Sequence, residues 1–203
     1  EGNGFVSTCG DTEHPDIQFA FLPSIVDDHT RKPHLGHGYT LHTTLMRPKS
    51  RGSVTLQSAD PHQAPAIDPA FFSHPDDIAV AMKGARMGFE VLEAKAMAPY
   101  RGKRLHPFDV NDDRALEHFL RTTCDTEYHP VGTCKMGPDS DPMAVVDAQL
   151  RVRGIQRLRV VDASIMPNLV SGNTNAPTMV IGEKAADLIR HSQHRSQLIS
   201  DMK

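Results

Sequence analysis

The spacing of apolar residues changes from a period of two to a period near 3.6 along the chain, and this change limits the possible folds. From 16 to 22 and from 39 to 47, apolar side chains alternate with polar or small ones, which indicates half-buried strands. From 75 to 97, apolar residues recur three and four positions apart, as on one face of a helix. Strands followed by helices, then strands again, predict an α+β fold with a mainly antiparallel sheet flanked by helices.

Shorter elements complete this pattern. A strand at 53–57 could pair antiparallel with the first two strands, and Ser73, followed three residues later by Asp76, is typical of a helix start. Asn111 can cap a second helix. The remaining predicted elements are that helix at 112–123, short strands at 150–152 and 158–161, and a last helix at 178–190.

Composition excludes several classes of function. The 203 residues hold 22 Lys and Arg against 25 Asp and Glu without a basic run, so nucleic acid is not an expected partner. No apolar stretch approaches the roughly 18–20 residues of a membrane-spanning helix. The odd number of cysteines (Cys9, Cys124 and Cys134) without a CxxC pair predicts free thiols in a reducing compartment. We therefore expect a cytoplasmic protein, with peripheral attachment to an inner membrane left open.

A histidine in a loop rich in glycine and proline is the first candidate for chemistry. His129 lies in the run Tyr-His-Pro-Val-Gly-Thr-Cys-Lys-Met-Gly at 128–137. Histidine titrates nearest neutrality and suits a proton-accepting role. Pro130 restricts the backbone of His129 to extended angles, and Gly132 permits close approach of another chain or a flat ligand. The alternative is an ordinary surface histidine.

Two further segments are candidates for ligand contact. The run Gly-Asn-Thr-Asn-Ala-Pro-Thr at 172–178 leads into the last predicted helix, whose unpaired first-turn amides can bind an electron-rich group such as a cofactor edge. Asp162 and Ala163 end an apolar strand, where residues often face a ligand crevice. Simple helix capping and a simple turn, respectively, are the alternatives.

Metal and thiol chemistry are disfavoured. His34, His37 and His42 are three and five positions apart, but no nearby cysteine or paired carboxylate completes a ligand set. On a strand, His37 and His42 would point to opposite faces. Cys134 lies five residues after His129 without a second residue to orient a base, so we interpret it as a packing residue. The sequence therefore predicts no metal site.

Several motifs together resemble one known family. The runs at 128–137 and 172–178 are joined by Val-Val-Asp at 145–147, Leu-Arg-Val-Arg-Gly at 150–154 and Val-Val-Asp-Ala-Ser-Ile-Met-Pro at 160–167. In this order they resemble the C-terminal signature of choline-dehydrogenase-like members of the glucose-methanol-choline (GMC) oxidoreductase family. Upstream, the runs at 36–39 and 47–52 resemble the substrate domain of that family. The resemblance extends from about Phe5 to Arg190.

The resemblance implies a redox function. In that family a flavin, FAD, accepts a hydride at N5 as a primary alcohol becomes an aldehyde, with help from a histidine and a second histidine or asparagine. His129 matches the first of these catalytic positions and Asn173 the second. Asp162 and Ala163 match positions near the ribityl and pyrophosphate part of FAD. Asn173, Thr174 and Asn175 match positions beside the isoalloxazine ring.

The resemblance also implies that part of the enzyme is missing, because the chain has no GxGxxG fingerprint. Residues 1–143 would form the substrate-binding and catalytic domain, 144–190 a strand and helix that complete an absent N-terminal Rossmann half, and 191–203 a polar tail. We expect the chain alone to be inactive, with that FAD-binding half and a small-molecule alcohol as its partners. The identity of the alcohol and the choice between oxygen and a quinone as electron acceptor stay open.

A non-catalytic binding module that keeps the substrate-domain fold without cofactor is the alternative hypothesis. The presence of both His129 and Asn173 weighs against it, because a pure binder has no need of the pair. A metal hydrolase is a third possibility and would contain zinc.

Overall fold

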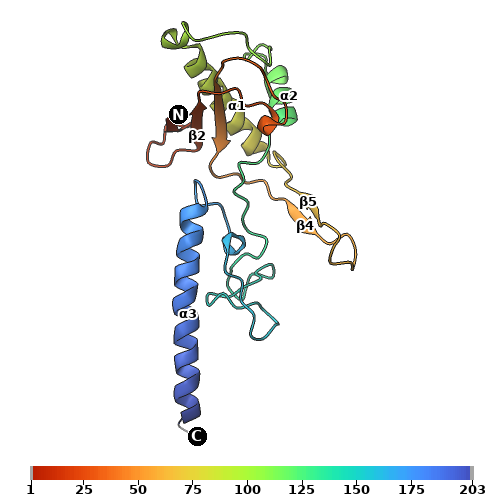
Figure 1. The fold of residues 1–203 in the computed structure, drawn as a ribbon, viewed down its shortest axis with the longest axis vertical. Helices are drawn as coiled ribbons and strands as arrows, with labels where there is room; N and C mark the ends of the chain where they lie inside the picture. Colours follow the sequence, from red (N-terminus) through yellow and green to blue (C-terminus); the bar gives the residue numbers. More distant parts are fainter. Residues whose placement is uncertain (1, 202–203) are drawn as a thin grey trace. The chain divides into compact units, whose positions relative to one another are not determined.

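The computed structural model describes residues 2–201, and side chains up to residue 192 (Figure 1). The chain divides into a first unit, Glu1–Glu127, and a second unit, Tyr128–Lys203. This division falls before the boundary predicted at 143. That boundary concerned packing on another stretch of polypeptide and stays a prediction.

The first unit is built on a three-stranded antiparallel sheet. Its strands are β1 (Gly2–Val6), β2 (Ile17–Leu22) and β3 (Thr40–Leu45), in that spatial order. The alternation at 16–22 and 39–47 thus predicted two of the three strands and their antiparallel pairing. β1 was not predicted, because a strand with two glycines carries little alternation of apolar and polar side chains.

A long helix covers this sheet. α1 (Pro75–Glu93) packs against β3 and β2 and is followed by the short 3-10 helix η2 (Lys95–Met97), so the regular helix ends earlier than predicted. Gly84 permits the close approach, since a Cβ there would lie 2.7 Å from Cδ1 of Ile17, which is fully buried. The core of this unit therefore lies between α1 and the sheet.

The starts of both helices in this unit differ from the sequence prediction by one residue. His74, not Ser73, caps α1, and its Nδ1 accepts the amide N–H of Asp76 at 3.2 Å. Asp112, not Asn111, caps α2 (Asp113–Thr123). Adjacent residues can each act as caps, and the backbone decides which side chain reaches the free amides.

The Asp112 cap leads to a stability prediction. Its Oδ1 accepts the amide N–H of Arg114 at 2.9 Å and that of Ala115 at 3.3 Å. Asp112→Ala should therefore lower the free energy of unfolding by about 1 kcal/mol, as measured by urea denaturation. Asn111→Ala removes the neighbouring side chain that does not cap and serves as the control. An equal loss in both variants would contradict the assignment.

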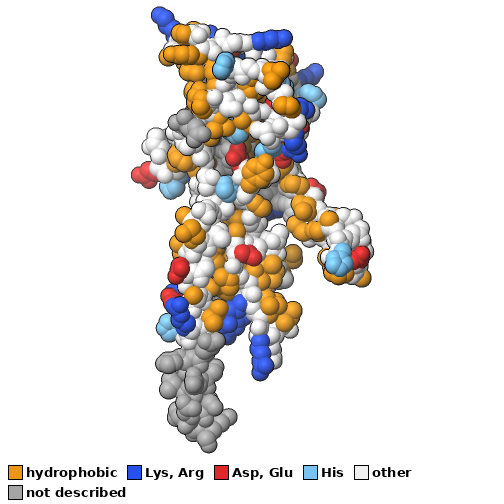
Figure 2. Space-filling view, viewed as in Figure 1, with side chains coloured by type: hydrophobic (Ala, Val, Ile, Leu, Met, Phe, Trp, Pro, Cys, Tyr) orange, Lys and Arg blue, Asp and Glu red, His pale blue; other side chains and the backbone are white. Residues whose placement is uncertain are grey.

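The strand predicted at 53–57 does not join the central sheet. β4 (Ser53–Thr55) pairs antiparallel with β5 (Ala66–Asp68) in a separate two-stranded hairpin. The hairpin exposes large apolar side chains, namely Val54, Leu56 and Ile67. Figure 2 shows hydrophobic side chains gathered along it. The prediction that this strand could pair with the first two was wrong. Its actual partner, β5, was not predicted, because its three residues show no recognisable alternation.

The second unit has little regular structure before its helix. The strands predicted at 150–152 and 158–161 form only isolated bridges, Val146 to Val152 and Arg151 to Arg159. Leu150 and Arg157 have φ angles of 63° and 62°, which turn the chain out of the extended conformation that a longer ladder needs. The core of the unit consists of Val146, Leu150, Ile165 and Ala185.

The last helix is longer than predicted. α3 spans Asn175–Asp201, starting three residues before the predicted Thr178 and continuing through most of the predicted polar tail. Pro177 fits within its first turn, where its missing N–H has no intrahelical partner to lose. No described helix is long and apolar enough to cross a membrane.

Candidate active site

The structure brings together the two side chains that the sequence singled out as catalytic. Nδ2 of Asn173 lies 2.7 Å from Nε2 of His129, although the residues are 44 positions apart. The side chain of His129 is half-buried and that of Asn173 is exposed, so the pair lies at the surface of the second unit. An imidazole and a carboxamide at this distance form one polar centre.

The backbone fixes where His129 points. Tyr128, just before it, has a φ angle of 62°, an uncommon conformation for a residue with a side chain, and Pro130 follows it. The side chain of Thr174 is buried, and its Oγ1 lies 3.0 Å from Nδ1 of the ring. Both ring nitrogens of His129 therefore have partners from the segment that precedes α3.

The loop after His129 is anchored to the segment around the 3-10 helix η3 (Ala163–Ile165). The amide N–H groups of Cys134 and Met136 donate to the carbonyls of Ser164 at 3.0 Å and Ile165 at 2.8 Å. Gly132 has a φ angle of 93°, which favours glycine. The run at 128–137 thus lies alongside the run at 160–167, as their joint occurrence in one signature suggests.

Asp162 and Ala163 serve a local role in this structure. Oδ1 of Asp162 accepts the amide N–H of Ser164 at 2.8 Å and caps η3. No hydrogen bond among the described residues joins Asp162 or Ala163 to His129 or Asn173. Their predicted contact with a cofactor stays a prediction.

The start of α3 offers free hydrogen-bond donors next to the pair. The amide N–H groups of Asn175 and Ala176 bond to no described residue, whereas that of Thr178 donates to the carbonyl of Thr174 at 3.0 Å. Unpaired first-turn amides at the positive end of a 27-residue helix attract electron-rich acceptors. The carbonyl edge of a flavin ring is such an acceptor, so the residues present fit this cofactor.

The sequence did not predict the role of Thr174 toward His129. It placed Thr174 among the cofactor-binding residues, through the resemblance alone. A threonine before a helix is typical of a cap. Nothing in its neighbours indicates that its hydroxyl faces a ring 45 positions away.

The histidines considered as metal ligands have separate partners. Nε2 of His34 contacts Oδ2 of Asp27 at 2.8 Å, and His42 lies 3.4 Å from a carboxylate oxygen of Glu127. His37 lines a small polar cavity with Pro23 and Ser24. Within residues 2–192, no three His, Cys, Asp or Glu side chains are arranged to hold a metal ion.

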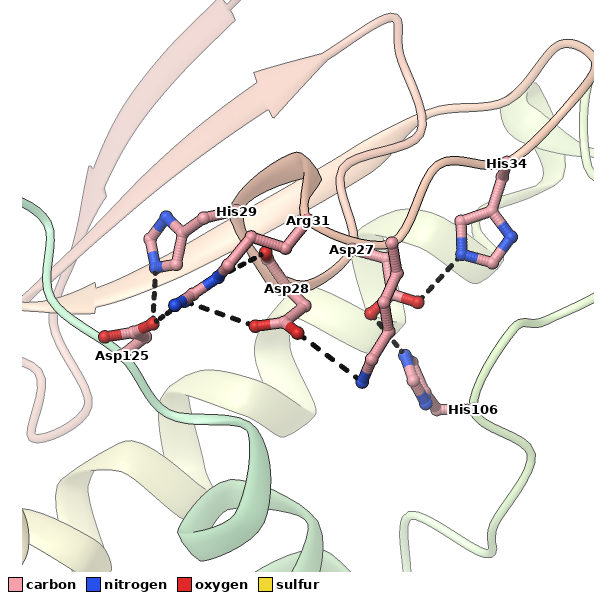
Figure 3. A network of polar contacts seen from close by, with 8 residues as sticks. Asp27, Asp28, His29, Arg31, His34, His106 and Asp125 are labelled. Atoms are coloured by element: carbon pink, nitrogen blue, oxygen red, sulfur yellow. Dashed lines mark hydrogen bonds and ion pairs between the residues drawn. The ribbon is translucent and has the colours of Figure 1, made fainter.

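Asp27 belongs to a polar network of the first unit (Figure 3). Its two carboxylate oxygens face Nε2 of His34 and, at 3.3 Å, Nε2 of His106. The hydrogen bond from His34 lowers the pKa of Asp27 most, and burial acts in the opposite direction. Asp125 pairs in the same way with Arg31 at 2.6 Å and His29 at 3.1 Å. The network ties three loops together.

Comparison with known proteins identifies the family. Residues 48–182 match the C-terminal domain of the GMC oxidoreductase family. The chain belongs to the GMC oxidoreductase family. It is 49% identical to mitochondrial choline dehydrogenase of Mus musculus over 94% of this chain and 32% of that protein. It is 47% identical to alcohol dehydrogenase [acceptor] of Pseudomonas putida over 93% of this chain and 34% of that protein.

Two solved structures of oxidases share the fold. Pyridoxine 4-oxidase from Mesorbium loti matches with a TM-score of 0.82 and 31% identity, over 93% of this chain and 37% of that chain. A variant formate oxidase of Aspergillus oryzae, studied for the modification of its FAD, matches with a TM-score of 0.79 and 29% identity, over 90% and 32%. The chain thus spans about a third of the length of its relatives.

Proposed function

We propose that this chain is the C-terminal catalytic portion of an FAD-dependent enzyme that oxidises a primary alcohol to an aldehyde. The observation that carries the proposal is the contact of 2.7 Å between His129 and Asn173 beside the start of α3. The names of the relatives, choline dehydrogenase and alcohol dehydrogenase, supply the class of substrate.

The two side chains have complementary roles in this reaction. Nε2 of His129 accepts the proton of the substrate hydroxyl, which raises electron density at the carbinol carbon and favours departure of hydride from it. The amide N–H of Asn173 donates to the substrate oxygen, where negative charge develops. Bound FAD would supply the acceptor for the hydride at its N5. The amides of Asn175 and Ala176 would hold the carbonyl edge of its ring.

The missing partner is an N-terminal FAD-binding half. The chain lacks GxGxxG, and its relatives are about three times as long. Between 144 and 190, large apolar side chains are exposed to solvent, namely Ile155, Leu158, Val161, Val170, Met179 and Val180. Apolar surface of this kind favours docking of another polypeptide segment. The segment 144–190 is therefore the proposed contact with that half.

A chimaera tests the proposal. The N-terminal two thirds of the Pseudomonas putida relative would be fused to this chain in place of its own matching segment. We expect flavin absorbance in the purified protein and reduction of an artificial electron acceptor on addition of a primary alcohol. The chain alone, with FAD added, should show neither. A folded chimaera that binds FAD but oxidises no alcohol would instead support the non-catalytic binding module.

A further inference from the structure

Four arginines of the second unit gather on one short stretch of chain. They alternate with apolar residues, as Arg-Val-Arg at 151–153 and Arg-Leu-Arg at 157–159. Leu150, Val152 and Val160 lie in the core of the unit or pack against it. Successive side chains of an extended chain point to opposite sides, so the arginines are expected on the side away from this core. All four are exposed or half-buried.

The pairing within this stretch places like charges opposite each other. Arg151 and Arg159 are partners in an isolated antiparallel bridge, and the amide N–H of Val152 donates to the carbonyl of Leu158 at 3.0 Å. Like charges directly opposite each other on paired chains repel and destabilise the pairing. Packing does not require this arrangement, whereas a bound anion would relieve the repulsion.

The four arginines line a cavity of about 410 Å³. Its lining also includes Asp139, Asp147, Ile155 and Leu158. Four arginines against two aspartates leave an excess of two positive charges. Ile155 and Leu158 are exposed and supply apolar surface beside the charges. The volume lies within the range of roughly 300–1,000 Å³ that small-molecule sites have.

Two of the arginines are held in place by the protein itself. Nη1 of Arg153 donates to Oδ1 of Asp139 at 2.6 Å, and Nη2 donates to the carbonyl of Gly137 at 2.8 Å. Nε of Arg159 donates to the carbonyl of Gln149 at 3.1 Å. These two side chains therefore form fixed, positively charged parts of the wall.

The other two arginines have free donors. The guanidinium groups of Arg151 and Arg157 bond to no described residue, and both side chains are exposed. Oδ1 of Asp147 accepts the backbone amides of Gln149 and Arg151, at 2.8 and 2.9 Å, and no guanidinium. A guanidinium presents its N–H donors in a planar fork that matches a carboxylate or a phosphate. Two free forks on one cavity suit an anion with two negative charges.

We propose that this cavity binds a small oxyanion with two negative charges, either a dicarboxylate or a phosphate compound. Arg151 and Arg157 donate hydrogen bonds to its oxygens, and its two charges balance the positive excess of the lining. Ile155 contacts the carbon part of an organic ligand. The inference does not depend on the proposed function, because neither His129 nor Asn173 lines the cavity.

Calorimetric titration of the chain itself tests the inference. Inorganic phosphate, succinate and acetate are the separate probes, at constant ionic strength and at a mildly alkaline pH where the first two carry two negative charges. We expect one saturable site for phosphate, succinate or both, and binding of singly charged acetate that is weaker by about tenfold or more. Phosphate alone would indicate a phosphate compound, and succinate alone a dicarboxylate. Equally weak binding of all three would overturn the inference.

Charge variants identify the binding residues. Arg151→Gln together with Arg157→Gln should weaken binding by about 100-fold, about tenfold for each charge-assisted contact that is lost. Circular dichroism should show an unchanged fold, because neither guanidinium bonds to a described residue. Lys184→Gln with Arg190→Gln is the matched control, since it removes the same charge from exposed positions of α3 outside the cavity. Equal weakening by both pairs would reduce the effect to net charge and overturn the site.

The chimaera decides whether the cavity stays open beside the rest of an enzyme. Most of its lining belongs to 144–190, the segment that we propose contacts an FAD-binding half. We expect the chimaera to bind the same probe with the same affinity as the chain. Loss of that binding in a folded chimaera would overturn the ligand site and indicate that the other half covers the arginines. A chimaera that keeps the binding but oxidises no alcohol would reject the proposed function alone.

Discussion

Replacement of His129 by glutamine should lower the rate of alcohol oxidation in the chimaera by about 10²–10⁴-fold, the usual contribution of a general base. Glutamine can keep a hydrogen bond to Asn173 but cannot take the hydroxyl proton at neutral pH. The loss should appear in kcat, because binding of the alcohol does not depend on that proton transfer. Stopped-flow reduction of the bound flavin by the alcohol measures the affected step directly.

The matched control for this variant is His191→Gln. His191 is an exposed histidine of the same unit, and Nδ1 of its ring lies 2.7 Å from the backbone carbonyl oxygen of Asp187. Its replacement should leave the rate unchanged, and flavin absorbance should be equal in both variants. A His129→Gln chimaera that binds FAD and retains a rate within tenfold of wild type would contradict the role of His129.

Replacement of Asp77 by asparagine should strongly destabilise the first unit. The side chain of Asp77 is only 3% exposed. Its carboxylate accepts hydrogen bonds from the amide N–H groups of Lys49 at 2.8 Å and Ser50 at 2.7 Å, and from the hydroxyl of Ser50 at 2.5 Å. Asparagine places an amide N–H against these donors. We expect a loss of about 3 kcal/mol in the free energy of unfolding, measured by urea denaturation.

Asp76→Asn is the control, because Asp76 is the adjacent carboxylate and pairs with Lys49 at the surface. Surface pairs contribute little, so its loss should be much smaller. An equal loss in both variants would contradict the special role of the buried carboxylate.

The Asp77 contribution should also depend on pH. Burial alone would raise the pKa of Asp77, but the hydrogen bonds from Lys49 and Ser50 outweigh it, and the pKa is lowered from its ordinary value of 3.8. A carboxyl with a lowered folded-state pKa stabilises the fold above pH 3.8 and loses this effect as the pH falls through the folded-state value. The stability difference between wild type and Asp77→Asn should therefore be constant near neutrality and shrink below about pH 4.

Elements with long, repeated sequence patterns were predicted correctly, whereas elements with short patterns were not. β2, β3 and α1 were predicted because several turns or alternations repeat the same signal. The helix caps were wrong by one residue, since Ser73 and Asn111 each have a neighbour that can also cap. The run at 158–161 has the composition of a strand, but its partners within the chain allow only an isolated bridge. A strand needs a partner strand, and composition does not supply one.

The site was predicted from the resemblance more than from the residues. His129 alone could not be distinguished from eleven other histidines, and its pairing with Asn173 came from the order of the motifs. The contact of Thr174 with Nδ1 depends on a side-chain rotamer and on the φ angle of Tyr128, neither of which the sequence encodes locally. A resemblance assigns positions, but the contacts between their side chains require coordinates.

Both His129 and Asn173 come from residues after the division at Glu127 and Tyr128. The pair that we propose removes the substrate proton is thus carried on one continuous stretch of polypeptide, separable in sequence from the sheet and helices that precede it. Exchange of the preceding residues between relatives could alter which alcohol is accepted while the reacting pair is inherited intact. Such an arrangement would allow substrate preference to change during evolution while the catalytic residues stay the same.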